Sequence, residues 1–120
     1  MRSVAMVLIA AVAVLHLYIL VLEMFLWRTP AGRRRFRLTP EKAEATAALA
    51  ANQGLYNGFL AAGLWWALLG NSAELFPRAT FFLCCVLVAG VYGGLTVMRS
   101  ILAVQALPAA LALAALWLSR

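Results

Sequence analysis

The segment from Ser3 to Trp27 is apolar apart from His16, Tyr18 and Glu23. A helix rises about 1.5 Å per residue, so this segment is long enough to cross a hydrocarbon layer of about 30 Å. Of all residues, 66% are hydrophobic and 12% are charged, whereas soluble domains are about half apolar and a quarter charged. Because lipid offers backbone polar groups no partner, the sequence predicts an all-α integral membrane protein.

A cleaved signal peptide is the alternative interpretation of this first segment, because Ala11-Val12-Ala13 resembles a cleavage site. However, the only basic residue before the apolar run is Arg2, and the run continues well beyond the supposed site. These two features favour a first membrane span that is retained.

A second helix is predicted to begin at Thr39-Pro40-Glu41, where a capping residue precedes a proline and an acidic residue. If this helix continues to about Leu69, it is roughly 43 Å long, which exceeds the thickness of a bilayer core. We therefore expect its first two turns, at residues 41–48, to lie in the cytoplasmic interface. A polar turn at residues 70–77 follows it.

A third span is predicted from residue 79 to about residue 98, and the chain then stays apolar to residue 117. A single helix over residues 79–117 would be about 58 Å long, nearly twice the bilayer core, so the chain must reverse. We place the reversal around Arg99-Ser100, with Gly93-Gly94 as a competing position. Pro108 is expected to kink the fourth span rather than end it.

Basic residues set the orientation of these four spans. Five arginines lie in the segment RTPAGRRRFR, from Arg28 to Arg37, between two apolar stretches. Such a segment stays in the cytoplasm and attracts anionic lipid headgroups, so we expect no nucleic-acid partner. This orientation puts both termini outside and separates the basic residues unequally: Arg28, Arg33, Arg34, Arg35, Arg37, Lys42 and Arg99 inside, against Arg2, Arg78 and Arg120 outside.

The predicted architecture is thus a single domain of residues 1–120, a four-helix bundle with up-down topology that spans the membrane four times. Cys84 and Cys85 are neighbours in the third span, where side chains about 100° apart do not form an ordinary disulfide. We interpret both as small core residues, and we expect no metal site.

The intramembrane polar residues gather near one depth, in the cytoplasmic half of the bundle. Ionisable groups inside membranes mark functional sites by default. Polar contacts that only hold helices together, worth about 0.6 to 2 kcal/mol each, are the alternative. The candidate ligand-binding residues are His16, Glu23, Asn52, Gln53, Tyr56, Asn57, Tyr92, Arg99 and Gln105.

Two residues of this set require partners. We predict that Glu23 pairs with Arg99, with His16 or with an amide of the second span, because an unpaired charge facing lipid is costly. Arg99 is predicted to share one helix face with Tyr92 and Thr96. The alternative for Arg99 is an extended side chain that reaches the headgroups.

The second span is predicted to be central. Gly54, Gly58, Ala61 and Ala62 give it a face of small residues that permits close helix packing, next to a face of amides that need hydrogen-bond partners. Burying both faces is difficult in one four-helix bundle, so we expect a homo-oligomer to supply the missing neighbours.

Four stretches carry a resemblance to a known family: HLYILVLEMFLW, ANQGLYNGFLAAGLWWALL, VAGVYGG and QALP. They resemble an uncharacterised family of small bacterial membrane proteins, domain of unknown function 1304, over nearly the whole chain. The resemblance implies a four-helix protein of the bacterial inner membrane, with no activity attached.

The second helix is also similar, more distantly, to that of the MAPEG family, membrane-associated proteins of eicosanoid and glutathione metabolism. Asn52 and Tyr56 match the spacing of that family's helix, but Leu55 replaces its ligand-binding glutamate. This resemblance implies a trimer with up-down topology, and a site for glutathione or another thiol that opens to the cytoplasm.

The leading functional hypothesis is a polar site in the cytoplasmic half that binds a small amphipathic or anionic ligand. In it, Arg99 and the arginine segment hold an anion, the amides orient it, and Glu23 with His16 moves a proton. No sequence motif specifies a reaction, so catalytic residues are not assigned. The alternatives are a MAPEG-like thiol-conjugating enzyme, a proton-coupled transporter, and a purely structural membrane protein.

Overall fold

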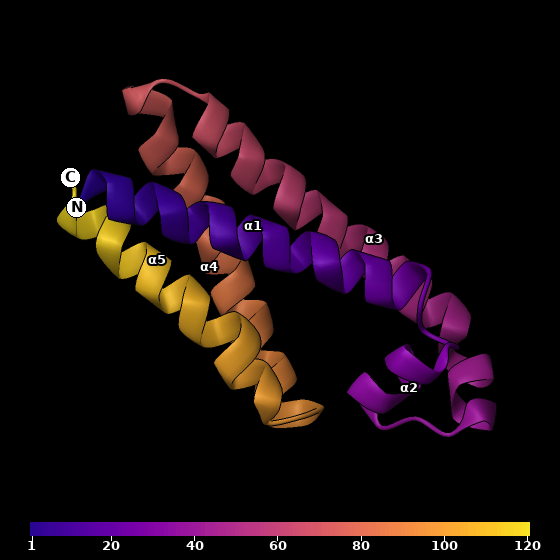
Figure 1. Cartoon of the computed structure of the whole chain (residues 1–120). Helices are drawn as coiled ribbons and strands as arrows, with labels where there is room; N and C mark the ends of the chain where they lie inside the picture. The colour runs from indigo at the N-terminus through magenta and orange to yellow at the C-terminus, as the bar shows by residue number, and fades with distance from the viewer. The chain divides into compact units, whose positions relative to one another are not determined.

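The computed structural model describes all 120 residues and consists of helices and short connections, which confirms the predicted all-α class (Figure 1). Two helices, α1 and α4, are long and apolar enough to cross a membrane, and the apolar stretch Leu102–Leu118 is shorter. Helix α3 is less apolar than α1 and α4, and the amides Asn52, Gln53 and Asn57 contribute to this difference. The elements in chain order are α1 (Arg2–Met24), α2 (Pro30–Phe36), α3 (Pro40–Leu69), α4 (Ser72–Thr96), the π-helical segment η1 (Leu102–Ala106) and α5 (Leu107–Leu118).

Contacts between residues group the chain into two compact units. The long unit comprises residues 1–14 and 60–120, and the short unit comprises residues 15–59. Helices α1 and α3 each contribute residues to both units.

The core of the long unit is purely apolar. It contains large buried side chains, such as Ile9, Leu64 and Leu83, together with seven alanines, three of which belong to α5. Because the alanine side chain is small, neighbouring helix backbones approach closely and make many dispersion contacts. This packing holds the helices of the long unit together without a buried ion pair.

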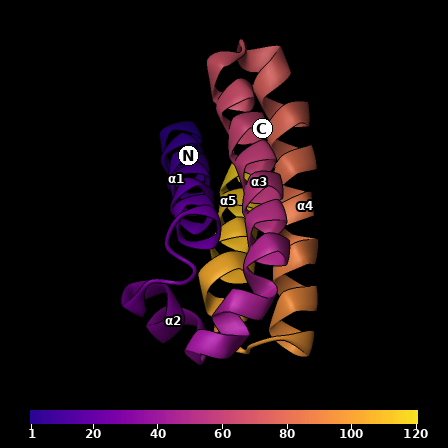
Figure 2. The ribbon, with the colours of Figure 1, turned by 90° about the vertical axis from the view of Figure 1, so that its right-hand side faces the viewer.

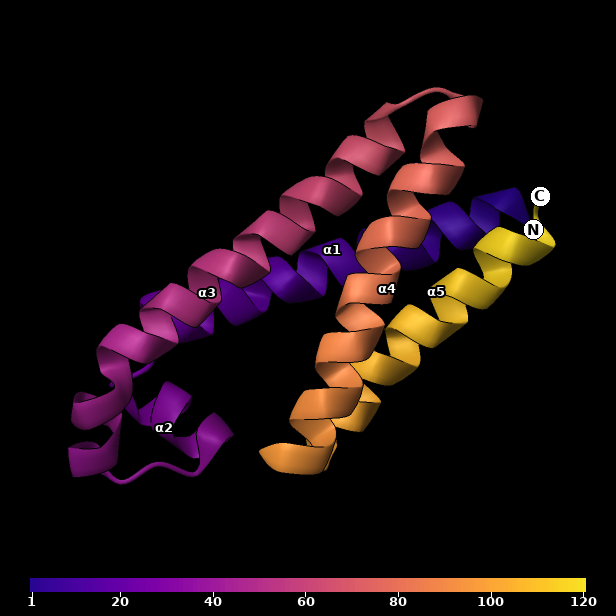
Figure 3. The ribbon, with the colours of Figure 1, turned by 180° about the vertical axis from the view of Figure 1, so that it is seen from behind.

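The turn between α3 and α4 is shorter than predicted (Figure 3). The predicted polar turn covered residues 70–77, but α4 already begins at Ser72, and Pro77 lies inside its first two turns. Asn71 and Glu74 explain the early start: each side chain accepts a hydrogen bond from the other's backbone N–H, at 3.0 and 2.9 Å. Pro77 lies beyond the first turn, so the helix lacks the backbone hydrogen bond that an N–H at this position would donate to the carbonyl of Ala73.

The reversal between the third and fourth predicted spans lies at residues 97–99, close to the predicted Arg99-Ser100 (Figures 1 and 3). Gly93-Gly94 remains inside α4. After the reversal the chain widens into the π-helical segment η1, directly before Pro108. A proline has no N–H and crowds the carbonyl four residues earlier, so the wider turn accommodates it. Near Pro108 the chain thus changes from π-helix to α-helix, and the helix continues past the proline as predicted.

The two cysteines of α4 differ in exposure. Cys84 is exposed and Cys85 is half-buried, and both are free thiols. The interpretation of Cys84 as a core residue was wrong. Leu83 precedes Cys84 by one position and Val86 follows it by two, and both are buried in the core. Successive residues of a helix are rotated by about 100°, so Cys84 faces away from the core.

The short unit contains a helix that was not predicted from the sequence, α2, within the arginine segment. Figure 2 shows α2 between the end of α1 and the start of α3. Thr29 caps α2: its hydroxyl accepts a hydrogen bond from the N–H of Gly32 at 3.2 Å and donates one to the carbonyl of Leu26 at 2.6 Å. A Cβ atom on Gly32 would lie 1.9 Å from that carbonyl oxygen, so the close approach requires glycine.

The predicted bounds of α3 are confirmed. It begins at Pro40 and ends at Leu69. The Thr39 hydroxyl accepts a hydrogen bond from the N–H of Lys42 at 3.1 Å, which is the capping interaction that the sequence predicted.

Candidate functional site

The short unit buries a carboxyl group in contact with an amide. Glu23 is only 6% exposed, and its Oε1 accepts a hydrogen bond from Nδ2 of Asn57 at 2.6 Å. The same Asn57 nitrogen also donates to the backbone carbonyl of Gln53 at 3.2 Å. Of the three partners predicted for Glu23, the structure selects an amide of the second predicted span.

Two glycines of α3 allow this contact. A Cβ atom on Gly54 would lie 2.7 Å from Cγ of Met24 and 3.0 Å from Cβ of Glu23, and one on Gly58 would lie 2.7 Å from Cδ1 of Leu20. Both distances at Met24 and Leu20 are shorter than real side chains tolerate. Close packing of α1 against α3 within the short unit therefore depends mainly on Gly54, because the atom facing Gly58 is the flexible end of the Leu20 side chain.

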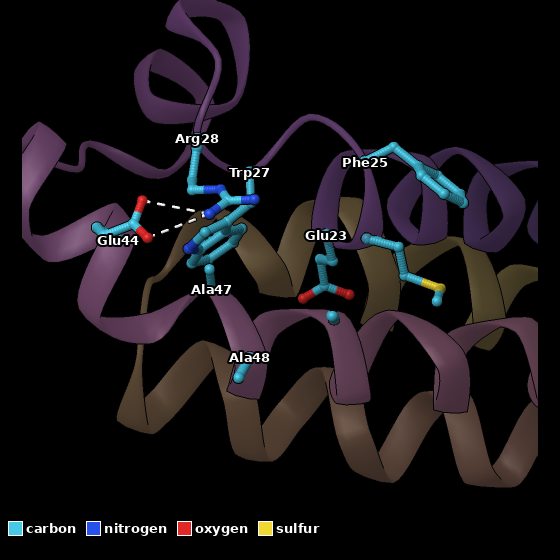
Figure 4. A pocket seen from close by; sticks show the side chains of 9 residues that line it. Glu23, Phe25, Trp27, Arg28, Glu44, Ala47 and Ala48 are labelled. Carbon is cyan, nitrogen blue, oxygen red and sulfur yellow. Dashed lines mark hydrogen bonds and ion pairs between the residues drawn. The ribbon is translucent and has the colours of Figure 1, made fainter.

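A polar pocket of about 410 Å³ opens beside Glu23 (Figure 4). Part of its lining comes from the end of α1 and the residues that follow it, and part comes from the first half of α3. The lining residues are Glu23, Met24, Phe25, Trp27, Arg28, Glu44, Ala47, Ala48 and Ala51.

Trp27 is held in one position at this pocket by two interactions. Its indole Nε1 donates a hydrogen bond to Oγ1 of Thr46 at 3.0 Å, and its ring packs against Phe36 with centroids 4.7 Å apart. The Thr46 hydroxyl in turn donates to the carbonyl of Lys42 at 2.7 Å. Because its polar group is already satisfied, Trp27 contributes mainly an apolar wall to the pocket.

An exposed ion pair borders the pocket beyond Trp27. In Figure 4 the Trp27 ring is seen between the Glu23 carboxylate and this pair, and Phe25 points away. Nη1 of Arg28 lies 3.1 Å and 3.3 Å from the two carboxylate oxygens of Glu44. Both side chains are more than half exposed, so the pair is screened by solvent and adds little stability.

The other predicted residues of α3 are not buried. Asn52, Gln53 and Tyr56 are exposed, and Asn57 alone is half-buried. The single chain leaves most of this amide face uncovered, and the predicted cover by a second copy of the chain stays a prediction. Only the glycine face and Asn57 meet α1 within the short unit, and the remaining amides lie further round the helix.

His16 is fully buried, like Glu23, and lies seven residues before it on α1. Seven residues make almost two helical turns, about 10 Å along the axis, so the two side chains share a helix face as predicted. They are the only buried polar or charged residues of the chain.

The remaining candidates, Tyr92, Arg99 and Gln105, belong to the long unit. Arg99 does not share a helix face with Tyr92 and Thr96, because α4 ends at Thr96 and the next three residues form the reversal. The Thr96 hydroxyl donates to the carbonyl of Tyr92 at 2.7 Å. Arg99 and Tyr92 are exposed and Gln105 is half-buried.

Sequence reasoning missed the pocket residues Trp27, Arg28 and Glu44. One signal was available, because Thr29-Pro30 repeats the cap-and-proline pattern of Thr39-Pro40 and so indicates a second helix start. A short helix between α1 and α3 brings the residues beside it close to the start of α3.

Comparison with known proteins places these features in a family. The family model described as "Protein of unknown function (DUF1304)" matches residues 10–117. The chain is also 34% identical over 115 residues to the "Uncharacterized protein YpaA" of Lactococcus lactis subsp. lactis (strain IL1403), covering 94% of this chain and 96% of that protein. No solved structure matches this chain significantly. The chain belongs to the DUF1304 family of proteins of unknown function.

Proposed function

We propose that this chain is a multi-pass protein of the cell membrane that binds a small amphipathic molecule in the pocket beside Glu23. The observation that carries the proposal is the buried Glu23 carboxyl group, hydrogen-bonded to Asn57 and bordering a polar pocket of about 410 Å³. Placing an ionisable group in an apolar helix costs free energy, and a structural role needs no pocket next to it.

The membrane part of the proposal is a four-helix bundle formed by α1, α3, α4 and the stretch from η1 through α5. The lengths and apolar character of α1 and α4 support it. The arginine segment Arg28–Arg37 supports a cytoplasmic position for α2 and external positions for both termini. We expect alkaline phosphatase to be active when fused after Arg120 and inactive when fused after Arg37. The opposite pattern would overturn this orientation.

The oligomer is a further part of the proposal, supported by the uncovered polar face of α3. Asn52, Gln53 and Tyr56 are exposed on a helix that we place in the membrane, where amides without a partner are unfavourable. A second copy of the chain would supply amide partners that are both donors and acceptors. We expect Asn52→Ala with Gln53→Ala to lower the oligomer fraction in crosslinking, whereas Ser100→Ala, at an exposed polar residue outside this face, leaves it unchanged.

The ligand part is tested by filling the pocket. Ala47 lines the pocket, whereas Ala45 is exposed on the same helix and does not. We expect at least one of octylammonium, octanol and octyl sulfate to raise the Tm of the protein in lipid nanodiscs. The rise in Tm should saturate as the probe concentration increases. Ala47→Phe should abolish this shift and Ala45→Phe should retain it. A shift that survives Ala47→Phe, or no shift with any probe, would contradict a ligand role for the pocket.

Proton-coupled transport is the second candidate, favoured by the burial of both His16 and Glu23 on one helix. Proton flux in proteoliposomes that Glu23→Gln abolishes would support it. Flux that is no greater than that of protein-free vesicles would remove it.

A further inference from the structure

The hydrogen-bonding groups around the pocket are not balanced between donors and acceptors. Oε1 of Glu23 accepts from Asn57, but the chain provides no donor to Oε2, although the residue is almost fully buried. A carboxylate can accept up to about four hydrogen bonds, so this group retains most of its acceptor capacity.

The donors nearest to the pocket are already engaged. The indole N–H of Trp27 donates to Thr46. Both hydrogens of the Asn57 amide are used, one by Glu23 and one by the carbonyl of Gln53. A ligand entering this pocket thus meets a free acceptor but few free donors.

The charged groups of the pocket lining also leave one acceptor without a partner. The lining contains two carboxyl groups, those of Glu23 and Glu44, and one guanidinium group, that of Arg28. The guanidinium donates hydrogen bonds to both carboxylate oxygens of Glu44. Arg28 therefore neutralises Glu44, and the carboxyl group of Glu23 is left without a positive partner.

The rest of the lining is apolar and suits a hydrocarbon chain. Met24, Ala47, Ala48 and Ala51 contribute aliphatic surface, and Trp27 contributes an aromatic ring that is fixed in place. Aromatic rings next to a carboxylate are a common surrounding for ammonium groups, because the ring face attracts cations.

We infer that the pocket selects a cationic amphiphile, an alkylammonium compound whose N–H groups donate to Oε2 of Glu23 while its chain packs on Trp27 and the alanines. This inference rests on the proposed ligand role of the pocket and specifies the charge of the ligand. It replaces the anionic ligand among those expected from the sequence, which depended on Arg99 and the arginine segment.

The test compares octylammonium, octanol and octyl sulfate, which share a chain and differ in head group. Titrations are followed through the indole N–H resonances of nitrogen-labelled protein in lipid nanodiscs. The resonance of Trp27 reports the pocket. Those of Trp66 and Trp117, which do not line it, report nonspecific partitioning into the bilayer.

We expect octylammonium to shift the Trp27 resonance saturably and to bind at least about tenfold more tightly than octanol, since hydrogen bonds to a charged group are worth about 1.5 kcal/mol or more. Glu23→Gln retains an oxygen that can accept from Asn57 but removes the charge, so it should weaken octylammonium binding by a similar factor. The control Glu41→Gln removes an exposed carboxylate on α3 outside the pocket, and binding should be unchanged.

Three results would count against the inference. Preferential binding of octyl sulfate or octanol at Trp27 would overturn the cationic preference and leave the ligand role intact. Equal octylammonium binding by wild type and Glu23→Gln would assign the preference to another group. Absence of any saturable shift with all three probes would remove both the inference and the ligand role. The ammonium-to-octanol comparison uses wild-type protein alone, so it holds even where the variant does not fold.

Discussion

The two compact units use similar helices but bury different chemistry. In the long unit the buried residues are aliphatic side chains and alanines. In the short unit the buried residues include His16 and Glu23, and a polar pocket opens beside Glu23. Close helix packing alone accounts for the long unit, because small residues let backbones approach. The short unit also buries an ionisable group, which is unfavourable in an apolar surrounding and is the basis of the proposed ligand site.

The largest effect is expected in the core of the long unit. Leu83 is fully buried, so Leu83→Ala should leave a cavity and lower the free energy of unfolding by about 2 kcal/mol or more. Phe81 on the same helix is 63% exposed, and Phe81→Ala should cost much less. Denaturation of the protein in mixed micelles measures both. Equal effects would mean that the long unit has no specific core.

Two glycines in α4 differ in how closely the neighbouring chain approaches them. A Cβ atom on Gly90 would lie 2.7 Å from the backbone nitrogen of Ala106, whereas one on Gly93 would lie 3.4 Å from the flexible side chain of Ile101. Gly90→Ala should therefore destabilise by about 1–3 kcal/mol. Gly93→Ala should be neutral or stabilising, since alanine favours helix by about 1 kcal/mol. Unfolding curves in the same micelles would disprove close packing if the order were reversed.

The polar pair of the short unit gives an effect of intermediate size. Asn57→Leu removes the only hydrogen-bond donor to Glu23 and leaves a buried acceptor unpaired, at a cost of about 1–2 kcal/mol. Adding Glu23→Leu should recover part of that loss, with a coupling energy of about 0.6–1.7 kcal/mol between the two positions. A double-mutant cycle on unfolding free energies measures the coupling. Strictly additive losses would show that the two residues do not interact.

The smallest effect is expected at the edge of the pocket. The Arg28 and Glu44 side chains are 62% and 70% exposed, so Arg28→Gln should change the free energy of unfolding by less than about 0.5 kcal/mol. Arg34→Gln, at an exposed position with no ion pair, is the matched control. A loss above about 1 kcal/mol, the upper end of the range for exposed ion pairs, would make this pair structural.

Local signals in the sequence predicted much of the fold. The bounds of α3 follow from a capping threonine and a proline that act within a few residues. The reversal near Arg99 follows from length, because one helix over that run exceeds the bilayer. The same capping pattern at Thr29 also begins a helix, which was not predicted because the arginines after it were interpreted only as a signal of orientation.

The site was predicted less well, because it depends on how helices meet. Three possible partners of Glu23 were predicted from the sequence, and the choice of Asn57 follows from the packing of α1 on α3 at Gly54 and Gly58. The resemblance to the MAPEG family rested on Asn52 and Tyr56, which are exposed in this chain. The aromatic wall at Trp27 depends on α2, and no periodicity of the apolar residues indicates it.

The most direct test of a functional short unit is the contact between Glu23 and Asn57 in a lipid bilayer. Solid-state NMR on protein with labelled carboxyl carbons and side-chain amide nitrogens measures whether the Glu23 carboxyl carbon lies beside Nδ2 of Asn57. The 2.6 Å hydrogen bond predicts strong transfer between these two atoms, lost in Asn57→Leu. Absence of transfer, with the Glu23 carboxyl group instead in contact with lipid chains, would contradict the account.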